Sequence, residues 1–546
     1  MISEREVLKA FPASGFRKYQ KETILRIANA FNSGVKCVLL DAPTGSGKSY
    51  INATFCRLIK SFYATPQLTL IDQIKADINI SGYFEEIKGR QNYYCYHDEG
   101  RNCSVGVCKQ LKNFECEKTE VCPYWIRKLK ALGANTVLMS FAYFMLEGKT
   151  DTVYSFGRRR LLVLDESHSI ERYVLGYVSL TISQYSLPYE FYEKIREDIP
   201  KTIKSIDELK IFVKAVLELL SVEKRRYEYE QQTLDGLSLG KTISLSKVED
   251  FESRAESFLD SLSETEWVWQ VNYATYKGMS SRWIIAQPLY AKLFMNEMVW
   301  NRADLFIVSS ATLLDSRRFI EETGLDRVMK FSEILHLKVP STFPVENRPI
   351  IDLSVGKMTK DERVDNIGKA IERLEGIIEL EKDNNIAVHA RSYEFARAIY
   401  NGIDEKYKPL IVTHDAENRD EALQKWKKGG GIFICVAFTE GQDWREDLYN
   451  CKAQVLFKVP YLDLADRRVA RRLELNQWSW YRGAALKETI QAYGRCVRSE
   501  TDKSKFYVID SSFWDLMKRS KKELPDWFRE ALPIGWENKG TKEAKK

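Results

Sequence analysis

A glycine-rich loop between a strand-like run and a helix-like run constrains this chain more than any other feature. The apolar run 35–40 is followed by DAPTGSGKS (41–49), and residues 50–62 (YINATFCRLIKSF) have a helical pattern. In that order, glycines let backbone amides close around a phosphate, and the N-terminus of the helix adds positive potential. Ala42 replaces the first glycine of the common pattern, but the main donors lie from Thr44 onward. The sequence therefore predicts an α/β fold with a P-loop.

The residues of this loop predict a site for ATP and Mg²⁺. We expect Lys48 to reach the terminal phosphates and the Ser49 hydroxyl to hold Mg²⁺. A later strand-like run, 161–164, ends in Asp165-Glu166-Ser167-His168. A carboxylate at the end of a neighbouring strand can hold Mg²⁺, and the next one can activate the attacking water. Asp165 is therefore the predicted metal ligand and Glu166 the predicted catalytic base. The predicted phosphate-loop contacts are Thr44, Gly45, Ser46, Gly47, Lys48 and Ser49.

The pattern of apolar runs predicts two α/β domains. Short runs typical of buried parallel strands fall into two sets, 35–40, 136–139, 161–164 and 305–308, then 386–388, 410–412, 432–436, 455–457 and 506–509. We place the domains at 1–337 and 338–537, because residues 338–348 carry two prolines, and we expect 538–546 to be a solvated tail. Residues 171–297 have helical periodicity instead, which predicts a helical insertion in the first domain.

Composition excludes some classes of protein. With 44% apolar and 29% charged residues, the chain is not disordered, and 83 basic against 77 acidic residues are too balanced to identify a nucleic-acid binder by charge. The start, MISEREVLKAFP, has no apolar core of signal-peptide length, and no run approaches the ~18 apolar residues of a membrane span. We expect a cytoplasmic protein that does not contact membranes.

Half of the ten cysteines are clustered: Cys95, Cys103, Cys108, Cys116 and Cys122 lie within 28 residues. In a reducing compartment such thiols are more often metal ligands than disulfides. The 117 positions between Lys48 and Asp165 exceed one crossover helix and leave room for an inserted module at 90–130. Four thiolates can hold a [4Fe-4S] cluster or one Zn²⁺, and composition does not choose between them.

Taken together, these motifs resemble those of the iron-sulfur helicases of superfamily 2, the branch that includes XPD and DinG. Arg17 and Gln20 in FRKYQKETI resemble the upstream motif that contacts adenine, and DAPTGSGKS and DESH are similar to motifs I and II. The usual form of motif II is DEAH, so Ser167 replaces an alanine. Ser310-Ala311-Thr312 matches the SAT motif, which in the family couples nucleotide state to domain movement.

The second half carries its own family motifs. HARSY (389–393) resembles motif IV, TEGQDW (439–444) resembles EGxDF, and QAYGRCVR (491–498) fits QxxGRxxR. On one helix Gln491, Arg495 and Arg498 would share a face, from which an arginine can reach the γ-phosphate. Either arginine can act in this way, and we favour Arg498. The resemblance implies two RecA-like motor domains with ATP between them, Asp443, Gln491, Arg495 and Arg498 facing the P-loop.

The resemblance also suggests which cysteines are ligands. Cys95 in GRQNYYCYH and Cys122 in CPYW resemble the first and last cluster ligands, and the gap from Cys116 to Cys122 resembles the family spacing. The predicted set is Cys95, Cys108, Cys116 and Cys122, with Cys103 as the alternate to Cys108. The family favours a [4Fe-4S] cluster over zinc, and it implies that 90–130 is the cluster domain and 171–297 the helical arch.

We therefore predict a monomeric, ATP-dependent DNA helicase that moves 5′ to 3′ on single-stranded DNA and acts on forked or tailed duplexes, the polarity being implied by the resemblance alone. The basic run Arg467, Arg468, Arg471 and Arg472 is either a contact to the DNA backbone or a solvated helix face. Two alternatives stay open. One is a translocase that remodels protein–DNA or RNA–DNA complexes without general unwinding, and the other is a metal-stabilised binding scaffold.

Overall fold

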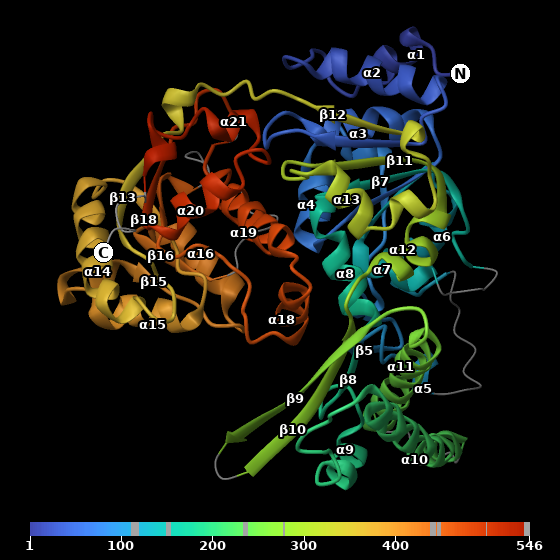
Figure 1. The fold of residues 1–546 in the computed structure, drawn as a ribbon. Coiled ribbons are helices and arrows are strands. Elements are labelled where there is room, and N and C mark those ends of the chain that lie inside the picture. The colour runs from blue at the N-terminus through green and yellow to red at the C-terminus, as the bar shows by residue number, and fades with distance from the viewer. Residues whose placement is uncertain are drawn as a thin grey trace.

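The computed structural model describes residues 1–110, 120–148, 154–232, 239–276, 279–436, 444, 449–497 and 499–539. Two parallel β-sheets form two lobes, as Figure 1 shows, and the chain crosses between them after β12. The α/β class and the two-lobed organisation predicted from the apolar runs are confirmed.

The sheet of the first lobe has seven strands in the order β12-β1-β11-β7-β2-β6-β3, and all neighbouring pairs are parallel. The strands are β1 (Cys37–Asp41), β2 (Ser61–Thr65), β3 (Glu85–Glu86), β6 (Thr136–Ser140), β7 (Arg159–Asp165), β11 (Ala303–Ser310) and β12 (Ile334–Lys338). Because helices cover both faces, the central strands bury nearly every residue, which explains their continuous apolar runs. The helices of this lobe are α1 (Glu4–Ala10), α2 (Gln20–Asn32), α3 (Lys48–Leu58), α4 (Leu68–Ala76), α6 (Pro123–Gly133), α7 (Phe141–Gly148), α8 (Ile170–Val178), α12 (Lys292–Met298) and α13 (Ser316–Glu322).

The second lobe has a six-stranded parallel sheet in the order β13-β18-β17-β14-β16-β15. Its strands are β13 (Ile350–Gly356), β14 (Asn385–His389), β15 (Ile411–Val412), β16 (Ile432–Cys435), β17 (Cys451–Leu456) and β18 (Lys505–Asp510). Its helices are α14 (Arg363–Leu380), α15 (Tyr393–Gly402), α16 (Arg419–Gly429), α18 (Arg467–Glu474), α19 (Trp478–Tyr493), α20 (Ser512–Arg519) and α21 (Asp526–Arg529).

Two sequence expectations about the first lobe are wrong. The helix after the P-loop ends at Leu58 rather than Phe62, and Ser61–Thr65 forms β2 in the interior of the sheet, between β7 and β6. Helical spacing continues through these residues, but pairing with two neighbouring strands overrides it. β12 runs to Lys338, so the connection between the lobes begins one residue later than expected.

The segment inserted between β7 and β11 is not helical throughout, as the sequence had led us to expect. It contains α9 (Tyr189–Ile195), α10 (Ile206–Gln232) and α11 (Leu239–Ser261), but also an antiparallel sheet of β8 (Leu180–Ile182), β9 (Trp267–Tyr276) and β10 (Met279–Pro288) in the order β8-β10-β9. Figure 1 shows β9 and β10 as a long pair projecting beneath both lobes. Burial alternates along β8 and along residues 284–288 of β10, which is the pattern of strands rather than of helices.

The cysteine-rich segment follows β3. Its described part contains the short antiparallel pair β4 (Tyr94–Cys95) and β5 (Asp98–Asn102), then α5 (Val107–Gln110) and α6, which begins directly after Cys122. Cys116 lies outside the described residues.

Candidate functional site

The P-loop lies where the sequence predicted it, between β1 and α3. β1 ends at Asp41, and Gly45 and Gly47 have positive φ angles of 78° and 81°, which let the chain turn tightly before α3. The Lys48 side chain is buried and folds back over the loop, with Nζ 3.0 Å from the Ala42 carbonyl oxygen and 3.9 Å from Glu166 Oε1. The lysine therefore already faces the carboxylate predicted to be the catalytic base.

Two residues of the upstream motif contact this loop. Arg17 Nη1 donates to the Gly45 carbonyl oxygen at 2.5 Å, and Gln20 Nε2 donates to the Ser46 carbonyl oxygen at 3.2 Å. A Cβ added to Gly47 would lie 2.0 Å from Gln20 Nε2, so only glycine allows this approach. The structure thus brings Arg17 and Gln20 to the P-loop, although they lie more than 25 residues before its lysine.

Asp165 ends β7 and is held by several hydrogen bonds. Tyr63 donates its hydroxyl to Oδ2 at 2.9 Å, and Ser309 Oγ and the Glu166 amide each donate to Oδ1 at 3.1 Å. Burial, reinforced by the charge of Glu166, raises the pKa of Asp165, while Lys48 and the two hydroxyls oppose this. Burial and the nearby carboxylate also raise the pKa of Tyr63 well above its ordinary value, so its hydroxyl stays a donor. Sequence motifs did not identify Tyr63 or Ser309.

Asp41 is a second buried carboxylate at this edge of the sheet that sequence reasoning passed over. Burial raises its pKa to about 7, against the opposing charges of Lys338 and Lys48. His336 on β12 lies 3.9 Å away, and burial together with Lys338 lowers the pKa of that histidine to about 4. The signal available in the sequence was the position of Asp41 at the end of a buried strand.

Side chains of the two lobes meet beside Glu166. His168 Nδ1 lies 2.8 Å from Ser310 Oγ and 3.4 Å from Glu166 Oε2. From the other lobe, Gln491 Nε2 contacts the His168 ring and donates to Thr312 Oγ1 at 3.2 Å. The predicted motif II, SAT and QxxGRxxR segments are therefore joined in one hydrogen-bonded network, with the P-loop close by. The backbone of Gly494, from the second lobe, lies close to the P-loop, because a Cβ added to it would be 3.3 Å from Thr44 Oγ1.

The predicted single helix carrying Gln491, Arg495 and Arg498 is wrong. α19 ends at Tyr493, and the Gly494 amide caps it by donating to the Ile490 carbonyl oxygen, so Arg495 lies beyond the helix. Arg495 is buried, its carbonyl oxygen accepts from the Trp444 amide at 3.0 Å, and burial together with this cation lowers the pKa of His389 to about 4. Arg498 and Asp443, predicted to face the P-loop, lie outside the described residues.

Comparison with known proteins agrees with this arrangement. A family model described as Type III restriction enzyme, res subunit matches residues 14–204, and the Helicase C-terminal domain matches residues 375–531. Over 93–94% of this chain and 98–99% of theirs, three solved structures are similar. These are an XPD helicase (TM-score 0.62, 16% identity), an XPD in the apo form (0.60, 17%) and Xpd4 of S. tokodaii (0.55, 16%). The two domain models lie in the two lobes, and together with the structural likeness they support a helicase fold. At these identities the likeness to the solved structures establishes the fold.

In this protein the basic run of α18 holds the lobes together instead of forming a solvated face. Arg468 and Arg472 both contact Glu171 of α8, and Arg472 also pairs with Glu322 of α13. Arg471 Nε donates to Glu266 Oε1 at 2.6 Å, at the start of the β9 strand region. Among the four arginines Arg467 is the most exposed, and its partner Glu474 lies on its own helix. Three of the four arginines considered as DNA contacts therefore form ion pairs with the first lobe.

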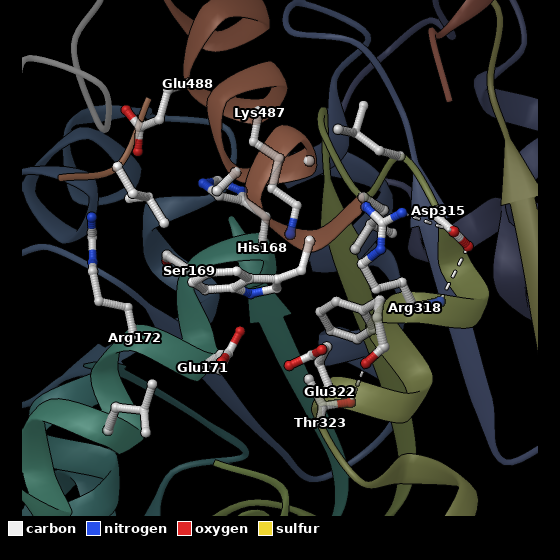
Figure 2. Close-up of a pocket in the computed structure, with 18 of the residues that line it drawn as sticks. His168, Ser169, Glu171, Arg172, Asp315, Arg318, Glu322, Thr323, Lys487 and Glu488 are labelled. Carbon is white, nitrogen blue, oxygen red and sulfur yellow. Dashed lines mark hydrogen bonds and ion pairs between the residues drawn. The ribbon is translucent and has the colours of Figure 1, made fainter. Parts of the chain in front are cut away.

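A cavity of about 380 Å³ lies between α8, α13 and α19, beside the His168 network. Figure 2 shows Lys487 of α19 pointing toward Glu171 and Glu322 from the opposite side. Arg318, also at this cavity, makes a two-pronged ion pair with Glu523 across the lobes, with both distances 3.0 Å. Burial lowers the pKa of Lys487, although Glu171 and Glu322 counteract this. Charged groups of both lobes therefore line the inter-lobe boundary.

The cysteine-rich segment brings two thiols into contact. Cys103 Sγ and Cys122 Sγ are 3.4 Å apart and buried, whereas Cys108 is half-buried on α5. The Cys103 thiol and the first amides of α6 lower the pKa of Cys122, which favours a thiolate. Cys95 is buried on the adjoining strand pair, where a Cβ on Gly106 would lie 2.8 Å from its Sγ. Within the described ranges, no three Cys, His, Asp or Glu side chains form a metal-binding group.

Among the described residues, no helix is both long enough and apolar enough to cross a bilayer.

Proposed function

We propose that this protein is an ATP-dependent DNA helicase that translocates on single-stranded DNA and couples ATP hydrolysis to duplex unwinding. The observation that carries the proposal is the contact of Gln491 with His168 and Thr312 across the lobes. Nucleotide bound at the P-loop lies beside these groups, so its state can alter the contact and hence the distance between lobes. A motor needs this coupling, whereas a static scaffold does not.

For the described residues, each proposed role follows from where the side chain lies, and the roles of Arg498 and Asp443 follow from the family resemblance alone. Lys48 would neutralise the terminal phosphates, and Glu166, 3.9 Å from Lys48 Nζ and 3.4 Å from the His168 ring, would orient and deprotonate the attacking water. Arg17 and Gln20 would hold the adenine side of the site while they fix the loop. Arg495, with Arg498 and Asp443, would approach from the second lobe, and an arginine there would stabilise charge in the transition state.

Asp165 and Ser49 have the oxygen donors that Mg²⁺ prefers, and both flank the phosphate loop. Bound there, Mg²⁺ would neutralise charge on the transferring phosphate. Burying the ionised carboxylate of Asp165 without a bound cation costs free energy, and this burial is what raises its pKa. The donor set therefore fits the ion.

Single-stranded DNA, presented by forked or tailed duplexes, is the proposed track, and 5′ to 3′ is the proposed direction. The support for both is the resemblance to the XPD and DinG helicases. The β9–β10 pair and α10–α11, projecting below the lobes in Figure 1, are the proposed arch over the strand. The basic run of α18 is not proposed as a contact, because Arg468, Arg471 and Arg472 are engaged with glutamates of the first lobe.

We further propose a [4Fe-4S] cluster held by Cys95, Cys103 and Cys122, with Cys108 or Cys116 as the fourth ligand. The Cys103–Cys122 contact favours Cys103 over its alternate, and a helix N-terminus that stabilises the Cys122 thiolate suits a metal ligand. When bound, the cluster would cross-link the segment before α6. Anaerobic purification with iron and sulfide analysis of single Cys→Ser variants tests this. Loss of iron in Cys103→Ser with retention in Cys56→Ala, a buried thiol of α3, supports the assignment, and full retention in Cys103→Ser contradicts it.

The ATPase proposal is tested with Lys48→Ala and with Lys36→Ala as the matched control. Lys36 lies on the surface before β1 and pairs with Glu333 at 2.8 Å, so its loss leaves the P-loop intact. We expect DNA-stimulated hydrolysis and unwinding of a tailed duplex to be abolished in Lys48→Ala and preserved in Lys36→Ala. Wild-type hydrolysis in Lys48→Ala would refute the proposal. Hydrolysis without unwinding of any tailed DNA or RNA substrate would favour the translocase instead.

A further inference from the structure

Three buried side chains outside the helicase motifs converge on Asp165. Tyr63 donates to Oδ2 at 2.9 Å, Ser309 donates to Oδ1 at 3.1 Å, and Asn52 contacts both hydroxyls. Asn52 Nδ2 lies 3.0 Å from Ser309 Oγ and 3.4 Å from Tyr63 OH. One amide group is thus linked through two hydroxyls to the two oxygens of one carboxylate.

The sheet explains why these residues meet. On β11, Ser309 pairs directly with Asp165, and on β2, Tyr63 pairs with Val163, two residues before Asp165 on β7. Because side chains alternate between faces with a period of two, Val163 and Asp165 share a face, and so do their partners. Neighbouring strands therefore place one hydroxyl on each side of the carboxylate.

Asn52 connects this group to the P-loop. It lies on α3, four residues after Lys48 and three after Ser49, so it projects from nearly the same side of the helix. Its side chain is fully buried and donates from one nitrogen to both hydroxyls. The amide hydrogens consequently orient the hydroxyls so that each gives its own hydrogen to Asp165. A displacement of α3 would therefore reach the carboxylate by two routes, each made of two hydrogen bonds.

The geometry points to Asn52, Tyr63 and Ser309 as positioning residues that orient the Asp165 carboxylate relative to the P-loop and so set the affinity of the nucleotide site for Mg²⁺. This inference rests on the proposed function, because it assigns a role to the groups behind the metal site. Tyr63 occupies one lone pair of Oδ2 and leaves the other for the ion, whereas Oδ1 accepts from both Ser309 and the Glu166 amide.

Tyr63→Phe tests the inference because it removes one hydroxyl and keeps the ring. Two measurements are made: the Mg²⁺ dependence of DNA-stimulated ATP hydrolysis, and the binding of a fluorescent ATP analogue in Mg²⁺ and in EDTA. We expect the half-saturating Mg²⁺ concentration to rise about 10-fold, the lower end for loss of a group behind a metal ligand. Binding in EDTA and the melting temperature should stay at wild-type values. Ser309→Ala should shift the Mg²⁺ dependence in the same direction.

Tyr50→Phe is the matched control. Tyr50 is on α3, as Asn52 is, but its hydroxyl contacts Asp77 at 3.2 Å and Asn79 at 3.0 Å instead of a group bound to Asp165. We expect its Mg²⁺ dependence to equal that of the wild type. An unchanged Mg²⁺ dependence in Tyr63→Phe, or an equal loss of binding with and without Mg²⁺, overturns the inference. A wild-type protein that neither binds nor hydrolyses ATP would instead refute the proposed function.

Discussion

Arg472 should hold the two lobes together, and its replacement by Met should let them separate. Its side chain is fully buried on α18. It pairs with Glu322, lies 3.5 Å from Glu171, and stacks 4.0 Å from the Trp480 ring. Glu322 and Glu171 belong to the first lobe, whereas Trp480 belongs to the second. Met keeps much of the stacking volume but removes a buried charge that pairs with two partly exposed carboxylates.

The size of the effect follows from these contacts. Removing one partner of a buried ion pair costs about 3–5 kcal/mol. The stacking on Trp480 and a 2.6 Å hydrogen bond to Gln477 are within the second lobe, so they do not hold the two lobes together. We therefore assign the lower end of this range, about 3 kcal/mol, to the inter-lobe contacts. At about 1.4 kcal/mol for each factor of ten, the equilibrium between closed and open lobes should shift about 100-fold toward the open form.

Single-molecule energy transfer measures this equilibrium, with dyes on non-natural amino acids at the exposed positions Ser33 and Lys382, one in each lobe. Arg467→Met is the control, because Arg467 is on the same helix and is 58% exposed. Its ion pair is with Glu474 of its own helix, at 3.9 Å, and does not cross the lobes. We expect a new low-transfer population in Arg472→Met alone. If both variants give the wild-type distribution, the ion pairs of α18 do not hold the lobes closed.

Three further outcomes are expected. Gln491→Ala should leave nucleotide binding intact but lower DNA-stimulated hydrolysis at least 10-fold, since it breaks the contact with His168 and Thr312; equal hydrolysis rates would exclude that coupling. Asp41, with a pKa raised to about 7 by burial, should make stability fall as pH rises from about 4 to 7, because the unfolded chain loses this proton first. At pH 8, Asp41→Asn should unfold less readily than the wild type by up to about 4 kcal/mol, at 1.4 kcal/mol per pKa unit, and the difference should vanish near pH 4 in denaturant titrations. Lys128→Met should lower the free energy of unfolding by about 3–5 kcal/mol, because it leaves Glu147 without its partner in a pair that is about 95% buried. Lys128→Met with Glu147→Leu should recover most of this loss. Identical denaturation midpoints for the single and double variants would show that the pair does not matter.

Most of what could be predicted from the sequence rests on local patterns of neighbouring residues. The P-loop, the DESH and SAT segments and nine of the strands are local patterns, and all lie where those patterns indicated. β2 was missed because Ser61–Thr65 continues the helical spacing of α3, and only its pairing with β6 and β7 makes it a strand. The predicted shared helix face of Gln491 and Arg495 is wrong because α19 ends at Tyr493, two residues before Arg495.

The class of fold and the kind of ligand follow from contiguous residues, since a strand, a glycine-rich loop and a helix must occur consecutively in a P-loop. Which distant groups act on that loop depends on how the sheets and helices pack. Tyr63 reaches Asp165 across 102 positions, Asn52 reaches Ser309 across 257, and Gln491 reaches His168 across 323. The arginines of α18 have the composition of a nucleic-acid contact, but they are satisfied by glutamates of the other lobe. Partners that are remote in sequence leave no periodicity, so their pairing emerges only when the sheets and helices have packed.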